Sequence, residues 1–189
     1  MPDRSPFSDL YDDDGDPGAV PIPISTTAVD YWGGMSRRAD EHRAIIGWRE
    51  WVQLPDLGVV EMKVKVDTGA DNSSLHAFNL ERFERDGTEY VRFEIHPKQR
   101  SRKPSIQCEA PLAMEKKVKN PGGRSELRPV IRTRVLVAGL ELNALVNLTS
   151  RDEMGFRMLL GRRAVRSKFV IDPGRSYLGA RPGRPQDAE

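Results

Sequence analysis

In Val64-Lys65-Val66-Asp67-Thr68-Gly69-Ala70 an alternating strand pattern runs directly into an Asp-Thr-Gly turn, and this combination is the most informative feature of the sequence. Val60 and Met62 extend the alternation toward the N-terminus, so we expect a half-buried strand over residues 59–66 with these apolar side chains on one face. Gly69 has no side chain and lets the backbone turn tightly, which brings its N–H toward the Asp67 carboxylate. The pattern therefore predicts a carboxylate held in a tight turn at the end of a sheet strand.

A second stretch, Met158-Leu159-Leu160-Gly161-Arg162, lies nearer the C-terminus. Taken with Asp-Thr-Gly, it resembles the retropepsin type of aspartic peptidase, in which a hydrophobic segment ending in Gly buttresses the catalytic loop and precedes a helix. The resemblance implies that Asp67 is the catalytic carboxylate. It also implies that Thr68, Gly69 and Ala70 form the loop that supports this carboxylate.

Aspartic peptidase chemistry needs two carboxylates, because two aspartates about 3 Å apart share one proton and act as base and acid. The sequence holds a single Asp-Thr-Gly motif, and Asp172-Pro173-Gly174 lacks both the hydroxyl and one backbone N–H. We therefore expect a homodimer in which each copy contributes Asp67, with Thr68 hydrogen-bonding across the dimer axis.

Further stretches are similar to a bacterial group that is often labelled ATP-dependent zinc protease and is better described as retropepsin-like. Its members are encoded near RimK-type ATP-grasp ligases that add glutamate to a ribosomal protein, so the resemblance implies such a ligase and such a ribosomal protein as partners. In retropepsins an acid after the turn pairs with an Arg after the glycine, and Asp71 and Arg162 occupy these positions. The similarity covers residues 43–179 and is carried by residues 46–51, 75–77, 93–97, 126–131 and 155–162.

Short apolar runs separated by turn residues are typical of β structure. Asn120-Pro121-Gly122-Gly123 is a strong turn signal and predicts a long hairpin between residues 113–119 and 127–137. A short helix is expected to follow Gly161 and to run through Arg166. We therefore expect a mainly β fold, a closed retropepsin-like acid-protease barrel with one short C-terminal helix. The other predicted strands cover residues 44–52, 89–96, 105–114, 140–148, 156–160 and 168–172.

The chain of 189 residues is expected to hold one folded domain with a tail at each end. Residues 1–40 are rich in Asp and Pro and lack an apolar period, so we expect a disordered acidic tail there. The peptidase domain is expected over residues 42–180, and a second disordered tail over residues 181–189. Residues 1–40 hold eight Asp and three Arg, a charge of −5, so the +2 of the whole chain leaves +7 on residues 41–189. The folded part is therefore basic.

The sequence argues against several other chemistries. Cys108 is the only cysteine, which rules out an intramolecular disulfide, and we expect it to be a core residue rather than a nucleophile. The three histidines, His42, His76 and His96, do not form a zinc-protease motif, and no Gly-Lys dipeptide is present for a phosphate-binding loop. We expect no metal and no cofactor. No stretch approaches the roughly 20 apolar residues that span a bilayer, and no secretory signal is visible, so we expect a cytoplasmic protein without a membrane partner.

Positive charge gathers in the predicted hairpin. If this hairpin closes over the active site as a retropepsin flap, its cations would surround a bound chain and favour acidic peptides. The alternative, of equal weight, is that they are the solvated face of an edge hairpin. A second basic run, residues 98–103, contains no aromatic residue, so we interpret it as a solvated loop and expect no nucleic-acid site there. The expected substrate-binding residues are Lys116, Lys117, Lys119, Arg124 and Arg128.

The sequence therefore favours a homodimeric aspartic endopeptidase that hydrolyses peptide bonds with an Asp67-activated water. Two alternatives stay open. One is an inactive barrel that serves as a binding or regulatory module for a glutamate ligase, and the other is a zinc metallopeptidase.

Overall fold

The computed structural model describes residues 43–119, 125–150 and 155–182 of the chain. Within them strands dominate, and the helical elements are one 3₁₀ turn, η3 (Pro55–Leu57), and one short α-helix, α1 (Arg162–Val165). The prediction of a mainly β chain with one short helix near its C-terminal end is confirmed. The strands are β1 (Ala44–Gly47), β2 (Arg49–Leu54), β3 (Val59–Asp67), β4 (Ser73–His76), β5 (Phe78–Arg85), β6 (Thr88–Ile95), β7 (Ile106–Lys119), β8 (Ser125–Val137), β9 (Leu140–Thr149), β10 (Met158–Gly161) and β11 (Phe169–Asp172).

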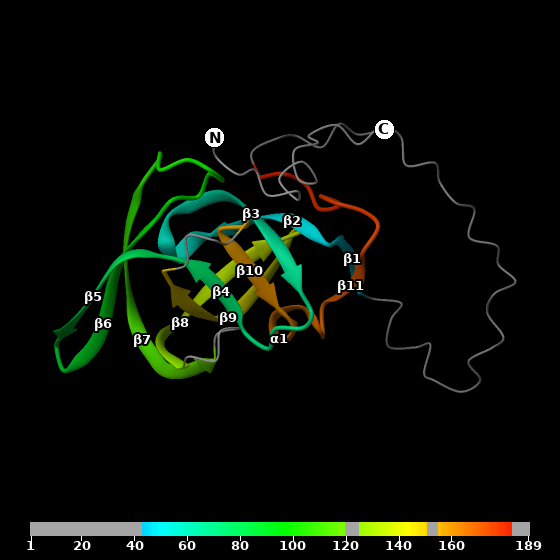
Figure 1. Ribbon diagram of the computed structural model, residues 1–189. Helices are drawn as coiled ribbons and strands as arrows, with labels where there is room; N and C mark the ends of the chain where they lie inside the picture. The colour runs from blue at the N-terminus through cyan, green and yellow to red at the C-terminus, as the bar shows by residue number, and fades with distance from the viewer. Residues whose placement is uncertain (1–42, 120–124, 151–154, 183–189) are drawn as a thin grey trace, which may run out of the picture. The chain divides into compact units, whose positions relative to one another are not determined.

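Nine of these strands form one sheet in the order β2-β3-β10-β4-β9-β8-β7-β6-β5. β2 also pairs with β8, at Val52↔Val137 and Gln53↔Leu136. Each of the first six strands in this order therefore pairs with two others of the six, and we call these six the round of strands. β5, β6 and β7 extend away from that round, toward the left of Figure 1. β1 and β11 form a separate parallel pair.

The strand β10 is inserted between β3 and β4, which are neighbours in the sequence. It runs parallel to β3, with Met158 opposite Val64, and antiparallel to β4, with Met158 opposite Leu75. The segment that connects β3 to β4 contains the Asp-Thr-Gly turn. A strand from near the C-terminus is therefore part of the framework that holds this turn.

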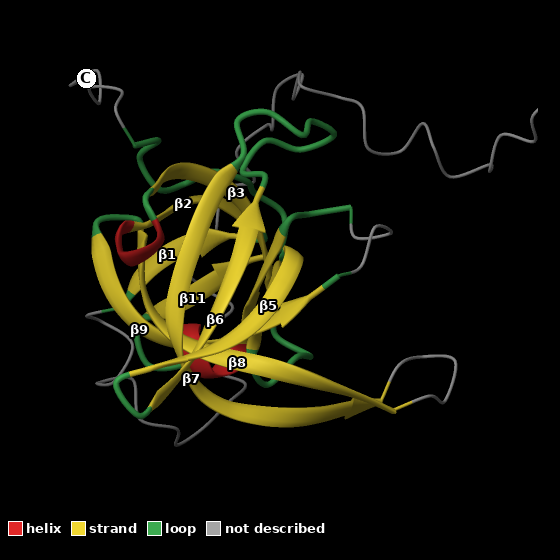
Figure 2. Ribbon diagram, turned by 90° about the vertical axis from the view of Figure 1, so that its left-hand side faces the viewer, coloured by secondary structure: helices red, strands yellow, loops and turns green. Residues whose placement is uncertain are grey.

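The long hairpin predicted around residues 120–123 is present as β7 and β8, which pair in antiparallel fashion from Leu112↔Ile131 to Lys119↔Ser125. Figure 2 shows the two strands running side by side out from the body of the sheet. β7 is one strand that covers both predicted segments, 105–114 and 113–119, with a register shift between Leu112 and Met114. The predicted turn residues themselves lie outside the described part of the chain.

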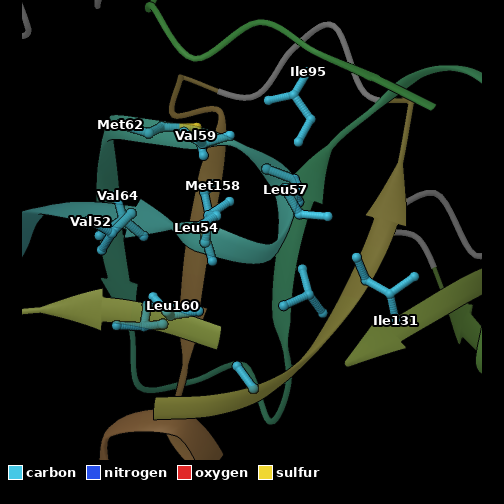
Figure 3. Close-up of a cluster of buried hydrophobic side chains, with 14 of the residues drawn as sticks. Val52, Leu54, Leu57, Val59, Met62, Val64, Ile95, Ile131, Met158 and Leu160 are labelled. Carbon is cyan, nitrogen blue, oxygen red and sulfur yellow. The ribbon is translucent and has the colours of Figure 1, made fainter. Parts of the chain in front are cut away.

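The core lies inside the round of strands, where the alternating residues of β2, β3 and β10 meet (Figure 3). Val52, Val64, Met158 and Leu160 are all fully buried. Each such side chain contributes roughly 1.5–3 kcal/mol through removal of apolar surface from water. The alternation around Val64 that predicted β3 is thus a packing requirement.

Two strand predictions are wrong in detail. Residues 44–52 form two strands that bend at Trp48, because β1 pairs with β11 while β2 pairs with β3. The bend packs closely, since a Cβ on Gly47 would lie 2.3 Å from the Arg175 carbonyl oxygen. In β3, Val60 is 74% exposed and Val59 is buried instead, because the pairing with β2 shifts register near Leu54.

The last described residues contact β2, where the Tyr177 N–H donates to the Arg49 carbonyl at 2.8 Å, and are held there by Glu50, whose side chain is fully buried. One oxygen, Oε1, accepts hydrogen bonds from the backbone N–H of Gly47 at 2.7 Å and of Leu178 at 2.8 Å, and Oε2 accepts from that of Gly179 at 3.1 Å. Arg181 donates two hydrogen bonds of 2.9 Å to Glu61. We call residues 174–182 the C-terminal strap. None of the described residues belongs to a helix long and apolar enough to cross a bilayer.

Candidate active site

The Asp67 side chain stands at the end of β3, half-buried, inside the turn that follows it. Its Oδ1 accepts hydrogen bonds from the backbone N–H groups of Gly69 and Ala70, both at 3.1 Å. A Cβ on residue 69 would lie 3.3 Å from the same oxygen, so a larger residue would crowd the carboxylate. The turn therefore fixes one oxygen of Asp67. Thr68 and Gly69 are exposed at its tip.

The β10 strand braces this turn from the side. Gly161 lies opposite Asp67 in the parallel pairing, and its N–H donates to the Ser73 hydroxyl at 3.1 Å. A Cβ at Gly161 would come within 2.4 Å of the Asn72 carbonyl carbon, a contact that cannot be accommodated without moving backbone. The next N–H, that of Arg162, donates to the Ala70 carbonyl at 2.8 Å. The hydrophobic-Gly segment and the Asp-Thr-Gly turn thus form one unit.

Three cations surround Asp71, the acid that follows the turn. Arg163 Nε lies 3.1 Å from Oδ1, Arg162 Nη2 lies 3.7 Å from the same oxygen, and Lys116 Nζ lies 3.9 Å from Oδ2. Arg162 also donates to the Thr68 carbonyl at 2.9 Å. Asp71 and Arg162 are therefore brought together, but Arg163 makes the shorter contact. Sequence reasoning missed Arg163, although its position directly after Arg162 was a usable signal.

The predicted substrate-binding cations fall into different places. Lys116 reaches the loop after Asp67, and Lys117 is exposed on the same strand. Arg128 differs from expectation, because it is 5% exposed and its guanidinium donates to Glu126 at 2.9 and 3.0 Å. Arg124 lies outside the described residues, and for Lys119 only its place in β7 is described.

The other chemically notable residues, Cys108, His76 and His96, are buried. Cys108 is buried, and burial raises the pKa of its thiol to about 11, which keeps it protonated and confirms its expected place in the core. His76 and His96 are buried and lie on either side of Phe78, each with its ring centroid 4.2 Å from the phenyl centroid. Among the described residues, no three His, Cys, Asp or Glu side chains are grouped closely enough to hold a metal ion.

A mainly β chain that ends one strand in Asp-Thr-Gly, and braces that turn with a Leu-Leu-Gly-Arg strand, defines a retropepsin-like protein. Residues 45–182 match the family described as RimB-like, retropepsin-like aspartic endopeptidase RimB. The chain belongs to this family, which confirms the resemblance seen in its sequence.

The chain is also similar to part of larger proteins that are named as glutamate ligases. The chain is 43% identical over 134 residues to a protein of Desulfotalea psychrophila named probable alpha-L-glutamate ligase, a match that covers 71% of this chain and 29% of that protein. A protein of the same name from Shewanella pealeana is 42% identical over 72% of this chain and 30% of its own length. The matched part is thus less than a third of these relatives.

A solved structure shows the same fold. A crystal structure of a Legionella pneumophila protein of unknown function superposes with a TM-score of 0.61 at 29% identity, covering 71% of this chain and 97% of that one.

Proposed function

We propose that this protein is an aspartic endopeptidase of the retropepsin type, active as a homodimer in which the round of six strands is a closed acid-protease barrel. The observation that carries the proposal is the Asp67 carboxylate, held through one oxygen by two backbone N–H groups beside Gly161. Because both hydrogen bonds go to Oδ1, the second oxygen of Asp67, Oδ2, can contact a water molecule or a neighbouring carboxylate.

The chemistry follows from pairing two such sites. One Asp67 carboxylate takes a proton from water as the water oxygen adds to the peptide carbonyl carbon, while the other, protonated, gives its proton to the carbonyl oxygen. When the C–N bond breaks, the departing nitrogen takes a proton from the dyad. The exposed position of Thr68 and Gly69 at the tip of the turn supports a contact with a second copy there.

A cleavage assay tests this function directly. Wild type and Asp67→Asn would be incubated with peptides that end in a run of glutamates and with neutral peptides of equal length, and products identified by mass spectrometry. We expect cleavage by wild type alone. Equal cleavage by both proteins would contradict the aspartic mechanism.

Within this proposal the β7–β8 hairpin acts as the flap and selects acidic peptides. The supporting observation is that Lys116 of β7 lies 3.9 Å from Asp71, so the hairpin reaches the loop that carries Asp67. Lys116, Arg162 and Arg163 give this region more positive than negative charge. Cleavage of an acidic peptide should fall steeply between low salt and about 0.5 M, where the Debye length is only a few Å, while a neutral peptide responds little.

The hairpin lysines can be tested separately from salt. Changing Lys116, Lys117 and Lys119 to Gln should remove the preference for acidic peptides. Lys168→Gln is the control and should keep the preference, because Lys168 is an exposed lysine that follows α1 and lies outside the hairpin. An undiminished preference in the triple variant would support the alternative that these lysines merely solvate an edge hairpin.

A second candidate function is a binding module for a glutamate ligase. It is favoured by one observation, that the matched region forms 29–30% of relatives named as such ligases. Co-purification with a ligase that persists in Asp67→Asn, together with absence of cleavage by wild type, would favour this role over the peptidase.

A further inference from the structure

The basic run 98–103 has no role in the proposed active site, yet it borders a cavity in the structure. The loop from Pro97 to Ser105 holds Lys98, Arg100, Arg102 and Lys103 and no acidic residue. It is ordered by its own contacts, because the Ser101 hydroxyl donates to the Lys103 carbonyl at 2.8 Å and accepts from the Lys103 N–H at 3.1 Å. These four cations therefore belong to a loop whose conformation is held by internal hydrogen bonds.

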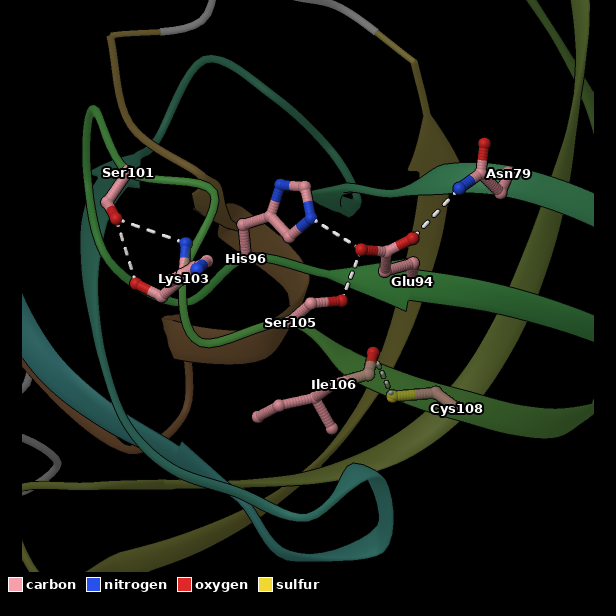
Figure 4. A network of polar contacts seen from close by, with 8 residues as sticks. All are labelled: Asn79, Glu94, His96, Ser101, Lys103, Ser105, Ile106 and Cys108. Carbon is pink, nitrogen blue, oxygen red and sulfur yellow. Dashed lines mark hydrogen bonds and ion pairs between the residues drawn. The ribbon is translucent and has the colours of Figure 1, made fainter.

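Glu94 anchors the base of this loop, as Figure 4 shows. Its Oε2 accepts a hydrogen bond from the Asn79 amide at 2.8 Å, and its Oε1 lies 2.7 Å from His96 Nε2 and also accepts from the Ser105 hydroxyl. The Ser105 and His96 contacts lower the pKa of Glu94 to about 2, so the carboxylate is ionised at neutral pH. Both of its oxygens are thus already occupied by protein donors.

The cavity beside Glu94 measures about 340 Å³, which is within the range of small-molecule sites. One wall is rigid, because Phe78 is held between the rings of His76 and His96. His96 is 6% exposed, and its Nδ1 points away from Glu94 and has no hydrogen-bond partner in the described structure (Figure 4). The lining residues are Phe78, Asn79, Glu94, His96, Arg102 and Ser150.

The polar groups left over in this cavity suit an anion. Because an ionised Glu94 accepts from His96 Nε2–H, a proton added to the ring would go to Nδ1 and make it a second donor. Arg102 forms no ion pair with any described residue, so its guanidinium is available as a charge-assisted donor. The Ser150 hydroxyl adds a further donor. A buried nitrogen without a partner is costly, and a protonated Nδ1 would donate to an anion oxygen that enters the cavity.

We propose that this cavity is a binding site for a small molecule or side chain that bears a carboxylate or phosphate group, held by Arg102 and His96. The site is separate from Asp67. β4 begins at Ser73, beside Gly161 and the catalytic turn, and ends at His76, next to the cavity, so the two sites lie at opposite ends of one strand, roughly 10 Å or more apart.

Titration calorimetry and NMR of the full chain test the site, with L-glutamate and inorganic phosphate as separate probes in a buffer of low ionic strength. The chain has only three histidines, so the ring ¹⁵N signals of His96 can be assigned by comparison with His96→Gln. We expect at least one probe to bind and to shift the His96 Nδ1 signal. Binding of glutamate alone assigns a carboxylate ligand, and binding of phosphate alone assigns a phosphate ligand.

Arg102→Gln is the decisive variant, because Arg102 is exposed and its replacement leaves the packing intact. It should weaken binding about tenfold or more, whereas Lys98→Gln, in the same loop but outside the cavity, should change it less than about twofold. Neither probe binding at about 10 mM, or equal weakening by both variants, would overturn the proposal. So would a loss caused by Lys116→Gln and not by Arg102→Gln, since that would assign the anion to the Asp67 end.

Discussion

Asp67 and Glu50 each accept hydrogen bonds from two or more backbone N–H groups, and they do so in opposite settings. Asp67 is half-buried, and its donors, Gly69 and Ala70, lie two and three residues ahead in the chain. Glu50 is fully buried, and two of its three donors, Leu178 and Gly179, come from the other end of the domain. The same hydrogen-bond chemistry therefore shapes a local, accessible turn in one place and ties distant segments together in the other.

This difference in burial and in donors indicates which carboxylate contributes to folding and which is available for chemistry. A buried acceptor that joins distant segments contributes to stability, because its removal leaves several N–H groups without partners. An accessible acceptor with only local donors contributes little to stability and remains open to water and substrate. We expect substitutions at the two positions to separate activity from folding.

The largest expected effect is on catalysis by Asp67→Asn. The amide keeps the shape and can still accept from Gly69 and Ala70, but it cannot act as a base or share a proton, so cleavage should fall at least about a thousandfold. The melting temperature and the sedimentation coefficient should stay at wild-type values. A variant that unfolds would show that Asp67 is structural, like Glu50.

Glu50→Ala should have the largest effect on stability. It leaves the N–H groups of Gly47, Leu178 and Gly179 without an acceptor, and we expect a loss of about 3–5 kcal/mol in the free energy of unfolding by urea. Glu61→Ala is the matched control, because Glu61 also holds the C-terminal strap, through Arg181, but at the surface. Equal stability of the two variants would show that burial does not set the contribution of these carboxylates to folding.

Gly161→Ala tests the brace behind Asp67. The added methyl would meet the Asn72 backbone at 2.4 Å, so we expect destabilisation of about 1–3 kcal/mol and lower cleavage as the turn is displaced. A Cβ at Gly155 meets nothing within 4 Å, which makes Gly155→Ala a suitable control. If both variants keep wild-type stability and activity, the close contact is not a constraint.

Arg162→Ala should have the smallest effect. Its side chain is 51% exposed and Arg163 still contacts Asp71, so the loss of stability should be under about 1 kcal/mol. Because Arg162 also donates to the Thr68 carbonyl at the tip of the turn, we expect weaker dimerisation by sedimentation. Arg166→Ala serves as the control, and identical dimerisation constants for the two variants would count against a role for Arg162 at the subunit contact.

Sequence alone predicted the parts of this structure that depend on local pattern. The alternation before Asp67 indicated β3, and the Gly-rich turn signal indicated the β7–β8 hairpin. β5 was missed, because most of its residues are exposed on an edge strand and carry no apolar alternation. Glu50 was missed for a related reason, since a charged residue is expected at the surface unless its distant partners are known.

In the candidate site, too, the features set by local motifs were predicted and those set by tertiary packing were not. The turn around Asp67 and the Gly161 brace follow from short motifs, so they were visible in the sequence. The contact of Lys116 with Asp71 and the burial of Arg128 depend on how the hairpin packs, which no local pattern encodes. The cavity beside His96 was hidden because its lining comes from four separate parts of the chain, from residue 78 to residue 150.

The insertion of β10 between β3 and β4 has a kinetic consequence. β3 and β4 cannot complete the frame around the Asp67 turn until residues 158–161 arrive, although the turn itself is synthesised some 90 residues earlier. Such long-range pairing is slow to form, since the entropy of closing the intervening loop must be lost first. During synthesis the emerging chain would therefore carry an incompletely supported Asp67 turn until the last strands leave the ribosome. Pulse-labelled hydrogen exchange should find the amides of Gly69 and Ala70 protected together with those of β10, and later than those of the β5–β6 hairpin.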